Sequence, residues 1–205
     1  EVYIGASIGI SLFPSDSGTV TEHIQHADVA MYQAKESRSN AYSFYTPALT
    51  HAANERLELE ARMRRGLAQG EFVLHYQPQL DMKTGALIGC EALVRWNTPE
   101  EGMISPARFI PLAEETGLIV PLGEWVLQNA CAQARAWLDA GFPPLLMAVN
   151  LSVRQLQQRD VVKRIALILA QVGLPASHLK LELTESMIMG QGEKAIELLH
   201  AIKAL

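Results

Sequence analysis

The chain has 205 residues, of which 49% are hydrophobic and 19% are charged, and its formal net charge is −5 at pH 7. This composition is that of a globular protein with enough apolar material for a core, and the length suits one or two domains. The mild acidity excludes a nucleic-acid polymer as a partner, because proteins that bind one present a basic face. No apolar run approaches the roughly 18 residues that a membrane span requires.

The cysteines and the two ends of the chain bear on its cellular context. Cys90 and Cys131 lie far apart, which fits a reducing compartment rather than a disulfide framework. No signal peptide opens the chain, so we expect a cytoplasmic protein. Both ends read as cut, because the chain begins inside a strand pattern and ends inside a helix pattern with no Gly or Pro after it. His23 and His26 share a helix face, but without a third ligand a solvated surface is favoured over a metal pair.

The first part of the chain predicts a strand, a helix and a strand. Residues 2–13 are rich in Ile, Val, Tyr and Phe, and residues 41–46 repeat that pattern. Between them, Thr19 and Glu22 have the spacing of a capping box at the start of a helix. Residues 47–70 then predict a charged helix that ends at Gly70 and acts as a stiff linker.

The remainder predicts a hairpin followed by alternating helices and strands. Residues 72–80 and 86–96 are strands joined by a connection so short that they must be antiparallel. The later elements are a helix that starts at Ser105-Pro106, a helix at 121–140, a strand at 145–151, a helical region capped by Ser152 and Gln155, a strand at 179–183 and a helix at 193–205. Apolar strands that alternate with amphipathic helices indicate an α/β fold with a parallel sheet or barrel. A (β/α)₈ barrel takes about 250 residues, so the stretch from Phe72 onward predicts half of one.

The second hairpin strand carries two charges on one face. Because side chains alternate along a strand, Glu91, Leu93 and Arg95 point to the same side. Glu91 and Arg95 lie about 13 Å apart along the strand, too far for an ion pair. They suit two parts of one ligand, a metal at Glu91 and a phosphate at Arg95. The alternative is an ordinary exposed sheet face with two charges.

Two further oxygen ligands follow apolar strands. Asn150 ends the run LLMAV, at the place where α/β barrels build active sites, although Asn also caps helices. Glu182 lies between leucines in a strand expected to be buried on both faces, where a carboxylate needs a partner. That partner is either a metal or a Lys or Arg elsewhere. Together with Glu91 these residues predict an oxygen-only site for Mg²⁺ or Mn²⁺, of the kind used in phosphodiester chemistry.

Five motifs then resemble the EAL domain of cyclic-di-GMP signalling proteins, in the order of that family. They are Tyr76-Gln77-Pro78-Gln79, Glu91-Ala92-Leu93-Val94-Arg95-Trp96, Phe109-Ile110-Pro111-Leu112-Ala113-Glu114-Glu115-Thr116-Gly117, Val149-Asn150-Leu151-Ser152 and Glu182-Leu183-Thr184-Glu185. The first 46 residues resemble the end of a GGDEF diguanylate cyclase, through Ala6-Ser7-Ile8-Gly9-Ile10-Ser11 and Ala27-Asp28-Val29-Ala30-Met31-Tyr32-Gln33-Ala34-Lys35.

The resemblance implies a domain organisation and an activity. Residues 1–46 would be the C-terminal end of a GGDEF domain, 47–70 a helical linker and 71–205 the N-terminal half of an EAL domain. The fold implied is a partial TIM-like barrel of EAL type with an antiparallel first strand, preceded by a strand-helix-strand remnant of the GGDEF domain. The activity implied is the phosphodiesterase reaction that opens cyclic-di-GMP to linear pGpG, in a parent protein with upstream sensory domains.

The resemblance also assigns roles to single residues. Glu91, Asn150 and Glu182 would be metal ligands, and Glu91 and Glu185 would serve catalysis. Gln77, Leu93 and Arg95 would contact the substrate, Arg95 through a phosphate. The family uses a pair of divalent ions, here Mg²⁺ or Mn²⁺, to activate water.

Two departures from the family pattern shape the expectation for this chain. The DDFGTG motif and the following catalytic lysine are absent from the 205 residues, so we expect no turnover by this chain alone. Arg38-Ser39-Asn40 stands where the GGDEF family has G-R-N, which puts GTP binding in doubt although Lys35 remains.

Two alternatives to an active phosphodiesterase follow. One is a catalytically inactive receptor for cyclic-di-GMP, which usually loses metal ligands. The other is a structural segment that pairs with a second copy. A half-barrel exposes a strand edge and an apolar face, so self-association of the chain is expected.

Overall fold

The computed structural model describes residues 5–37, 41–183 and 192–205. The chain forms two compact units, Glu1–Ala61 and Arg62–Leu205. The helix α2 (Pro47–Gln69) contributes residues to both, and Gly70 ends it with a φ of 74°, as its position after the charged helix predicts. None of the described helices combines the length and the apolarity that crossing a membrane requires.

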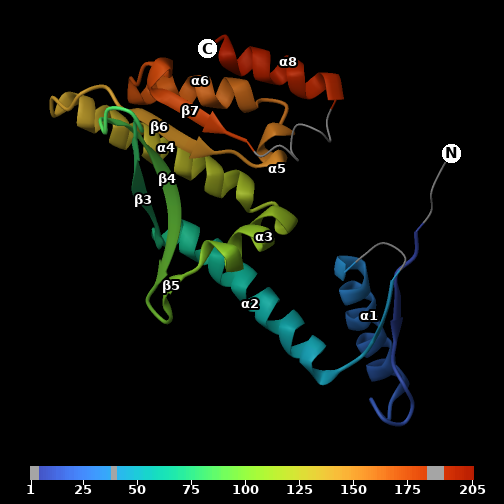
Figure 1. Ribbon diagram of the computed structural model, residues 1–205. Coiled ribbons are helices and arrows are strands. Elements are labelled where there is room, and N and C mark those ends of the chain that lie inside the picture. Colours follow the sequence, from blue (N-terminus) through green and yellow to red (C-terminus); the bar gives the residue numbers. More distant parts are fainter. Residues whose placement is uncertain (1–4, 38–40, 184–191) are drawn as a thin grey trace. The chain divides into compact units, whose positions relative to one another are not determined.

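The first unit pairs two short parallel strands beside one helix. Strand β1 (Ile8–Ile10) pairs with β2 (Tyr42–Phe44), and α1 (Val20–Ser37) connects them (Figure 1). The helix lies so close to β1 that a methyl group on Gly9 would overlap the carbonyl oxygen of Ala27. Only glycine therefore fits at this crossing.

The start of α1 confirms half of the predicted capping box. The Thr19 hydroxyl accepts the Glu22 amide at 3.3 Å. The Glu22 carboxylate, however, accepts the hydroxyls of Thr19 at 2.7 Å and Ser17 at 2.5 Å instead of the Thr19 amide. The strand predicted over 2–13 is wrong in length, because β2 offers only three pairing residues and the chain turns at Phe13–Asp16.

The second unit is built on a mixed five-stranded sheet. The strands are β3 (Phe72–Leu80), β4 (Leu87–Thr98), β5 (Gly102–Ile104), β6 (Leu146–Asn150) and β7 (Leu179–Glu182). Their order is β3-β4-β6-β7, with β5 on β4 (Figure 1). β3 and β4 are antiparallel, which confirms the predicted hairpin, and β4-β6 and β6-β7 are parallel. Among the described residues the sheet is open, with β3 and β7 as its outer strands.

Helices connect and cover these strands. They are α3 (Pro106–Thr116), α4 (Ile119–Asp139), α5 (Val153–Leu156), α6 (Val161–Val172) and α8 (Gly192–Lys203), with a 3₁₀ turn at Ala176–His178. α4 packs against β3, β4 and β6. At α5 the predicted capping box is complete, because Ser152 Oγ accepts the Gln155 amide at 3.3 Å and Gln155 Oε1 accepts the Ser152 amide at 3.0 Å.

An aromatic cluster anchors β4 in the core. Trp96 is fully buried, with its ring centroid 5.3 Å from that of Phe72 and 5.7 Å from that of Phe109. Its indole Nε1 donates to Glu71 Oε2 at 2.9 Å, so the one polar atom of the ring is satisfied. Since Arg95 and Trp96 are consecutive, this anchor fixes the strand that presents Arg95 on the opposite face.

Cys90 and Cys131 are both free thiols, and both are buried. Burial raises the pKa of the Cys131 thiol from 9.0 to about 11. The raised pKa means that this thiol stabilises the fold below pH 9 and that the contribution is lost as the pH rises through about 11.

We therefore expect slow thiol labelling of the native chain. At pH 8 the thiolate fraction of Cys131 is about a hundredfold below that of an ordinary thiol, and its side chain is fully buried. Labelling by an aromatic disulfide should be at least about a hundredfold slower in buffer than in denaturant. Cys90→Ala isolates Cys131, and rapid labelling of that native variant would contradict the burial.

Candidate functional site

Strands β4, β6 and β7 bring the three predicted metal ligands to one face, with Asn150 and Glu182 at the ends of their strands and Glu91 within β4. In the sheet register Asn150 lies opposite Glu182, and Glu91 lies opposite Ala148, two residues before Asn150. Because alternate residues of a strand share a face, Glu91, Asn150 and Glu182 all project from the same side. The parallel arrangement of these strands thus brings together residues that lie far apart in the sequence. Glu91 and Asn150 are 59 positions apart, and Asn150 and Glu182 are 32 positions apart.

Glu91 and Asn150 are in direct contact. Asn150 Nδ2 donates to Glu91 Oε1 at 2.6 Å. A half-turn of the amide would present Asn150 Oδ1, a metal-ligating oxygen, at the same place. The pair is therefore compatible with two oxygen ligands on one cation.

Glu182 is paired with a lysine, the second of the two kinds of partner that the sequence left open. Its Oε1 lies 2.8 Å from Lys180 Nζ, and the two side chains are 27% and 48% exposed. The expectation of a strand buried on both faces is wrong, because each residue of β7 is exposed or only partly buried. The alternative of a salt bridge to a basic residue describes this structure.

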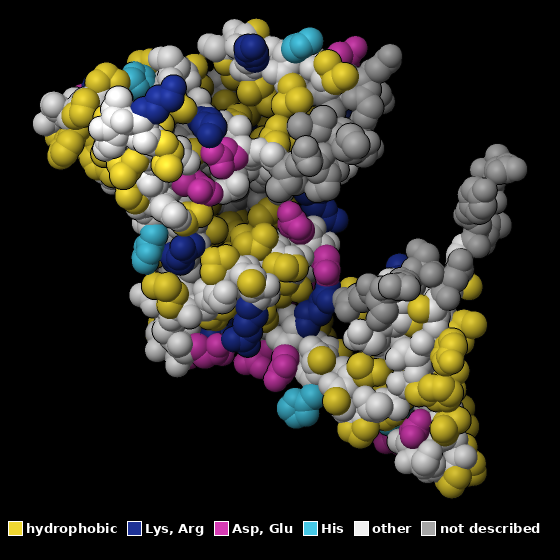
Figure 2. Space-filling model, viewed as in Figure 1, with side chains coloured by type: hydrophobic (Ala, Val, Ile, Leu, Met, Phe, Trp, Pro, Cys, Tyr) yellow, Lys and Arg dark blue, Asp and Glu magenta, His cyan; other side chains and the backbone are white. Residues whose placement is uncertain are grey.

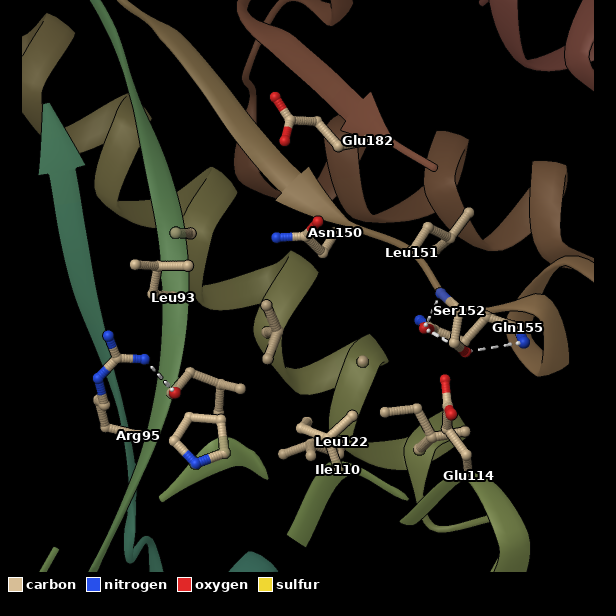
Figure 3. A pocket seen from close by; sticks show the side chains of 16 residues that line it. Leu93, Arg95, Ile110, Glu114, Leu122, Asn150, Leu151, Ser152, Gln155 and Glu182 are labelled. Carbon is tan, nitrogen blue, oxygen red and sulfur yellow. Dashed lines mark hydrogen bonds between the residues drawn. The ribbon is translucent and has the colours of Figure 1, made fainter. Parts of the chain in front are cut away.

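A pocket of about 310 Å³ opens beside these ligands (Figure 3). Four of the predicted site residues line it: Leu93, Arg95, Asn150 and Glu182. Arg95 Nη1 donates to the Val94 carbonyl at 2.9 Å, and its other N–H groups have no acceptor among the described residues. The guanidinium therefore remains available to a bidentate anion such as a phosphate.

The other predicted residues lie near the pocket or outside the described residues. Gln77 is exposed on β3 and pairs in register with Glu91, so both side chains share a face. Glu185 falls within 184–191 and lies outside the described residues. Each histidine of the pair has a local contact: His23 contacts Ser11 Oγ at 2.6 Å and the Ser17 carbonyl at 2.9 Å, and the His26 ring stacks on that of Tyr45 with centroids 3.8 Å apart.

Several residues that line the pocket were not predicted as site residues. The apolar floor includes Ile110 and Leu122, and Glu114 and Gln155 add polar groups at one end (Figure 3). Ile110 and Glu114 lie in one of the quoted motifs, and Gln155 was predicted only as part of a helix cap. The helices that carry them, α3 and α5, both pack against α4, and Arg154 Nη1 of α5 donates to the Glu115 carbonyl of α3 at 2.9 Å.

The donor set fits a hard divalent cation only in part. The described residues hold no group of three His, Cys, Asp or Glu side chains that would bind a metal. The site instead offers two carboxylates and one amide oxygen, all of which are ligand types of Mg²⁺ and Mn²⁺. Because Mg²⁺ takes six ligands and keeps several waters, three protein oxygens are a partial but suitable shell.

Comparison with known proteins decides the family. The sequence profile of the EAL domain matches residues 60–205. The chain belongs to the EAL domain family. It is 44% identical over 205 residues to the Pseudomonas aeruginosa protein MucR, named a bifunctional diguanylate cyclase/cyclic di-GMP phosphodiesterase. It is 38% identical over 205 residues to PdeR of Escherichia coli, named a cyclic di-GMP phosphodiesterase.

Solved EAL structures share the fold. The PaMucR phosphodiesterase in its c-di-GMP complex superposes with a TM-score of 0.70 at 44% identity, over 72% of this chain and 60% of that one. The Xanthomonas citri FimX EAL domain in complex with c-diGMP gives 0.66 at 29% identity, over 75% and 60%. The MucR and PdeR matches extend over 100% of this EAL chain, but the chain spans only 30% and 31% of the length of those proteins.

Proposed function

We propose that this EAL chain supplies part of the active site of a cyclic-di-GMP phosphodiesterase that releases linear pGpG. The observation that carries the proposal is the Glu91–Asn150 contact at 2.6 Å, with Glu182 on the neighbouring strand and Arg95 in the adjoining pocket. Cation ligands beside a guanidinium that donates only to the Val94 carbonyl among the described residues suit a phosphodiester, because the negative phosphate can be contacted by both the cation and the arginine.

Each proposed residue has a distinct task. Glu91, Asn150 and Glu182 would hold Mg²⁺ or Mn²⁺, and Arg95 would orient the phosphate through its free N–H groups. Gln77 and Leu93 would contact the ligand from the same face, and Glu185 would support the site. A bound divalent ion would lower the pKa of a water molecule and offset charge on the phosphate. Hydrolysis would also need the DDFGTG motif and lysine, which the 205 residues do not contain.

We further propose the domain organisation that the sequence implies. Residues 1–46 would be the end of a GGDEF domain, 47–70 a linker and 71–205 half of an EAL barrel. The MucR match supports this, because it extends over the whole chain and that protein carries a diguanylate cyclase name. We also propose a cytoplasmic protein that pairs through its EAL domain. Input from upstream sensory domains would fit the greater length of the relatives.

The test is product release by a chimera. Residues 60–205 replace the matching residues of MucR, and cyclic-di-GMP consumption with Mn²⁺ is followed by chromatography for pGpG. We expect product from the chimera and none from the 205-residue chain alone. If the chimera binds cyclic-di-GMP but releases no product, the inactive-receptor alternative is supported instead. If the chimera neither binds cyclic-di-GMP nor releases product, the proposal is contradicted.

A further inference from the structure

Lys180 lies at the metal-ligand edge, which is the part of the sheet face that carries Glu91, Asn150 and Glu182. The proposed function gives Lys180 no role. It is the register partner of Ala148 on β6, and Ala148 is in turn the register partner of Glu91 on β4. One row across the sheet therefore reads Glu91, Ala148, Lys180, and the next row holds Asn150 and Glu182. Adjacent strands are about 4.8 Å apart, so Lys180 lies on the same face, about 10 Å from Glu91 by backbone spacing.

Both carboxylates at this edge are engaged by donors of the chain itself. Asn150 Nδ2 donates to Glu91 Oε1 at 2.6 Å, and Lys180 Nζ lies 2.8 Å from Glu182 Oε1. Among Glu91, Asn150, Lys180 and Glu182, Lys180 carries the positive charge that offsets the two carboxylates. Lys180 thus neutralises half of the charge that a divalent cation would use.

We propose that Lys180 is a positioning residue that holds Glu182 in place and competes with the divalent cation for it. This inference rests on the proposed metal site. To ligate a cation, Glu182 must release the Lys180 ammonium group and bind the metal instead. Asn150 must rotate its side-chain amide so that Oδ1, rather than Nδ2, faces the cation held by Glu91. Lys180 can leave because its side chain is 48% exposed and ends in a flexible stem that water can solvate.

The competition sets an expected size for the effect. A half-exposed ion pair such as Lys180–Glu182 has only a small favourable free energy, which the cation must overcome to bind Glu182. The Lys180 ammonium group a few ångströms from a divalent ion adds a repulsion of comparable size. Lys180→Met keeps the unbranched stem of the side chain, one atom shorter, and removes both effects. We expect it to tighten Mn²⁺ binding by about three- to tenfold.

The experiment is a Mn²⁺ titration of the 205-residue chain, followed by electron paramagnetic resonance of the free ion. Lys163→Met is the matched control, since it removes the same charge from an exposed position on α6 and should change binding by less than about twofold. In a Glu182→Gln background the effect of Lys180→Met should also fall below about twofold, which assigns it to this pair.

The outcomes separate the two proposals. Tighter Mn²⁺ binding by Lys180→Met, with unchanged binding by Lys163→Met, supports the competition between Lys180 and the cation for Glu182. Equal binding by wild type, Lys180→Met and Lys163→Met would overturn the role of Lys180 and leave the metal site intact. The absence of Mn²⁺ binding in every variant would overturn the metal site and, with it, this inference.

Discussion

Replacing Glu91 with Gln is expected to reduce pGpG formation by the MucR chimera more than about a hundredfold. Groups that merely support a metal ligand change activity by about 10- to 100-fold, so loss of a ligand charge should exceed that range. Glutamine keeps an oxygen that accepts the Asn150 Nδ2 hydrogen bond but lacks the carboxylate charge. The melting temperature should therefore stay within about 2 °C of the parent chimera.

The control for this prediction is Glu197→Gln, an exposed glutamate on α8 away from the described ligand edge. Its turnover should match the parent within about twofold, because surface substitutions rarely matter. An unchanged rate for Glu91→Gln would show that Glu91 is not a ligand, and equal losses in both variants would indicate misfolding.

Replacing Trp96 with Ala is expected to be the most destabilising single change in the second unit. The side chain is fully buried against Phe72 and Phe109, and its Nε1 bonds Glu71. Truncating such a residue lowers the free energy of unfolding by about 3–5 kcal/mol. Urea unfolding followed by the fluorescence of Trp125 and Trp137 reports this, because both lie in Arg62–Leu205.

Two companion variants make the Trp96 measurement specific. Met103→Ala removes a side chain that is 56% exposed on the neighbouring strand β5, and should change stability by less than about 0.5 kcal/mol. Trp96→Phe keeps an aromatic ring but loses the donor to Glu71, so its effect should fall between the two. A loss below about 1 kcal/mol for Trp96→Ala would mean that the cluster does not anchor β4.

Local sequence signals predicted the elements that carry the site. The hairpin, the strand that ends at Asn150 and the cap formed by Ser152 and Gln155 each depend on neighbouring residues, and the structure confirms all of them. Strand alternation also placed Glu91, Leu93 and Arg95 on one face. The strand predicted over 2–13 was wrong in length, because an apolar pattern does not specify how many residues find a pairing partner.

Features that depend on the order of strands and the packing of helices were not predictable locally. The exposure of Glu182 depends on what packs against β7, which the local sequence does not specify. Its pairing with Lys180 is a local feature that was missed, because residues two apart on a strand share a face. The contribution of Glu114 to the pocket follows from the packing of α3 beside α5. A pattern of residues identifies which face a side chain shares, but not what lies against that face.

The most direct measurement of the central claim is a crystal structure of the chain grown with Mn²⁺ and examined by anomalous diffraction. The account predicts an anomalous peak about 2.0–2.2 Å from carboxylate oxygens of Glu91 and Glu182 and from Asn150 Oδ1, with the amide turned relative to its metal-free orientation. A Mn²⁺ peak elsewhere on the chain, with Asn150 Nδ2 still bonded to Glu91, would contradict it.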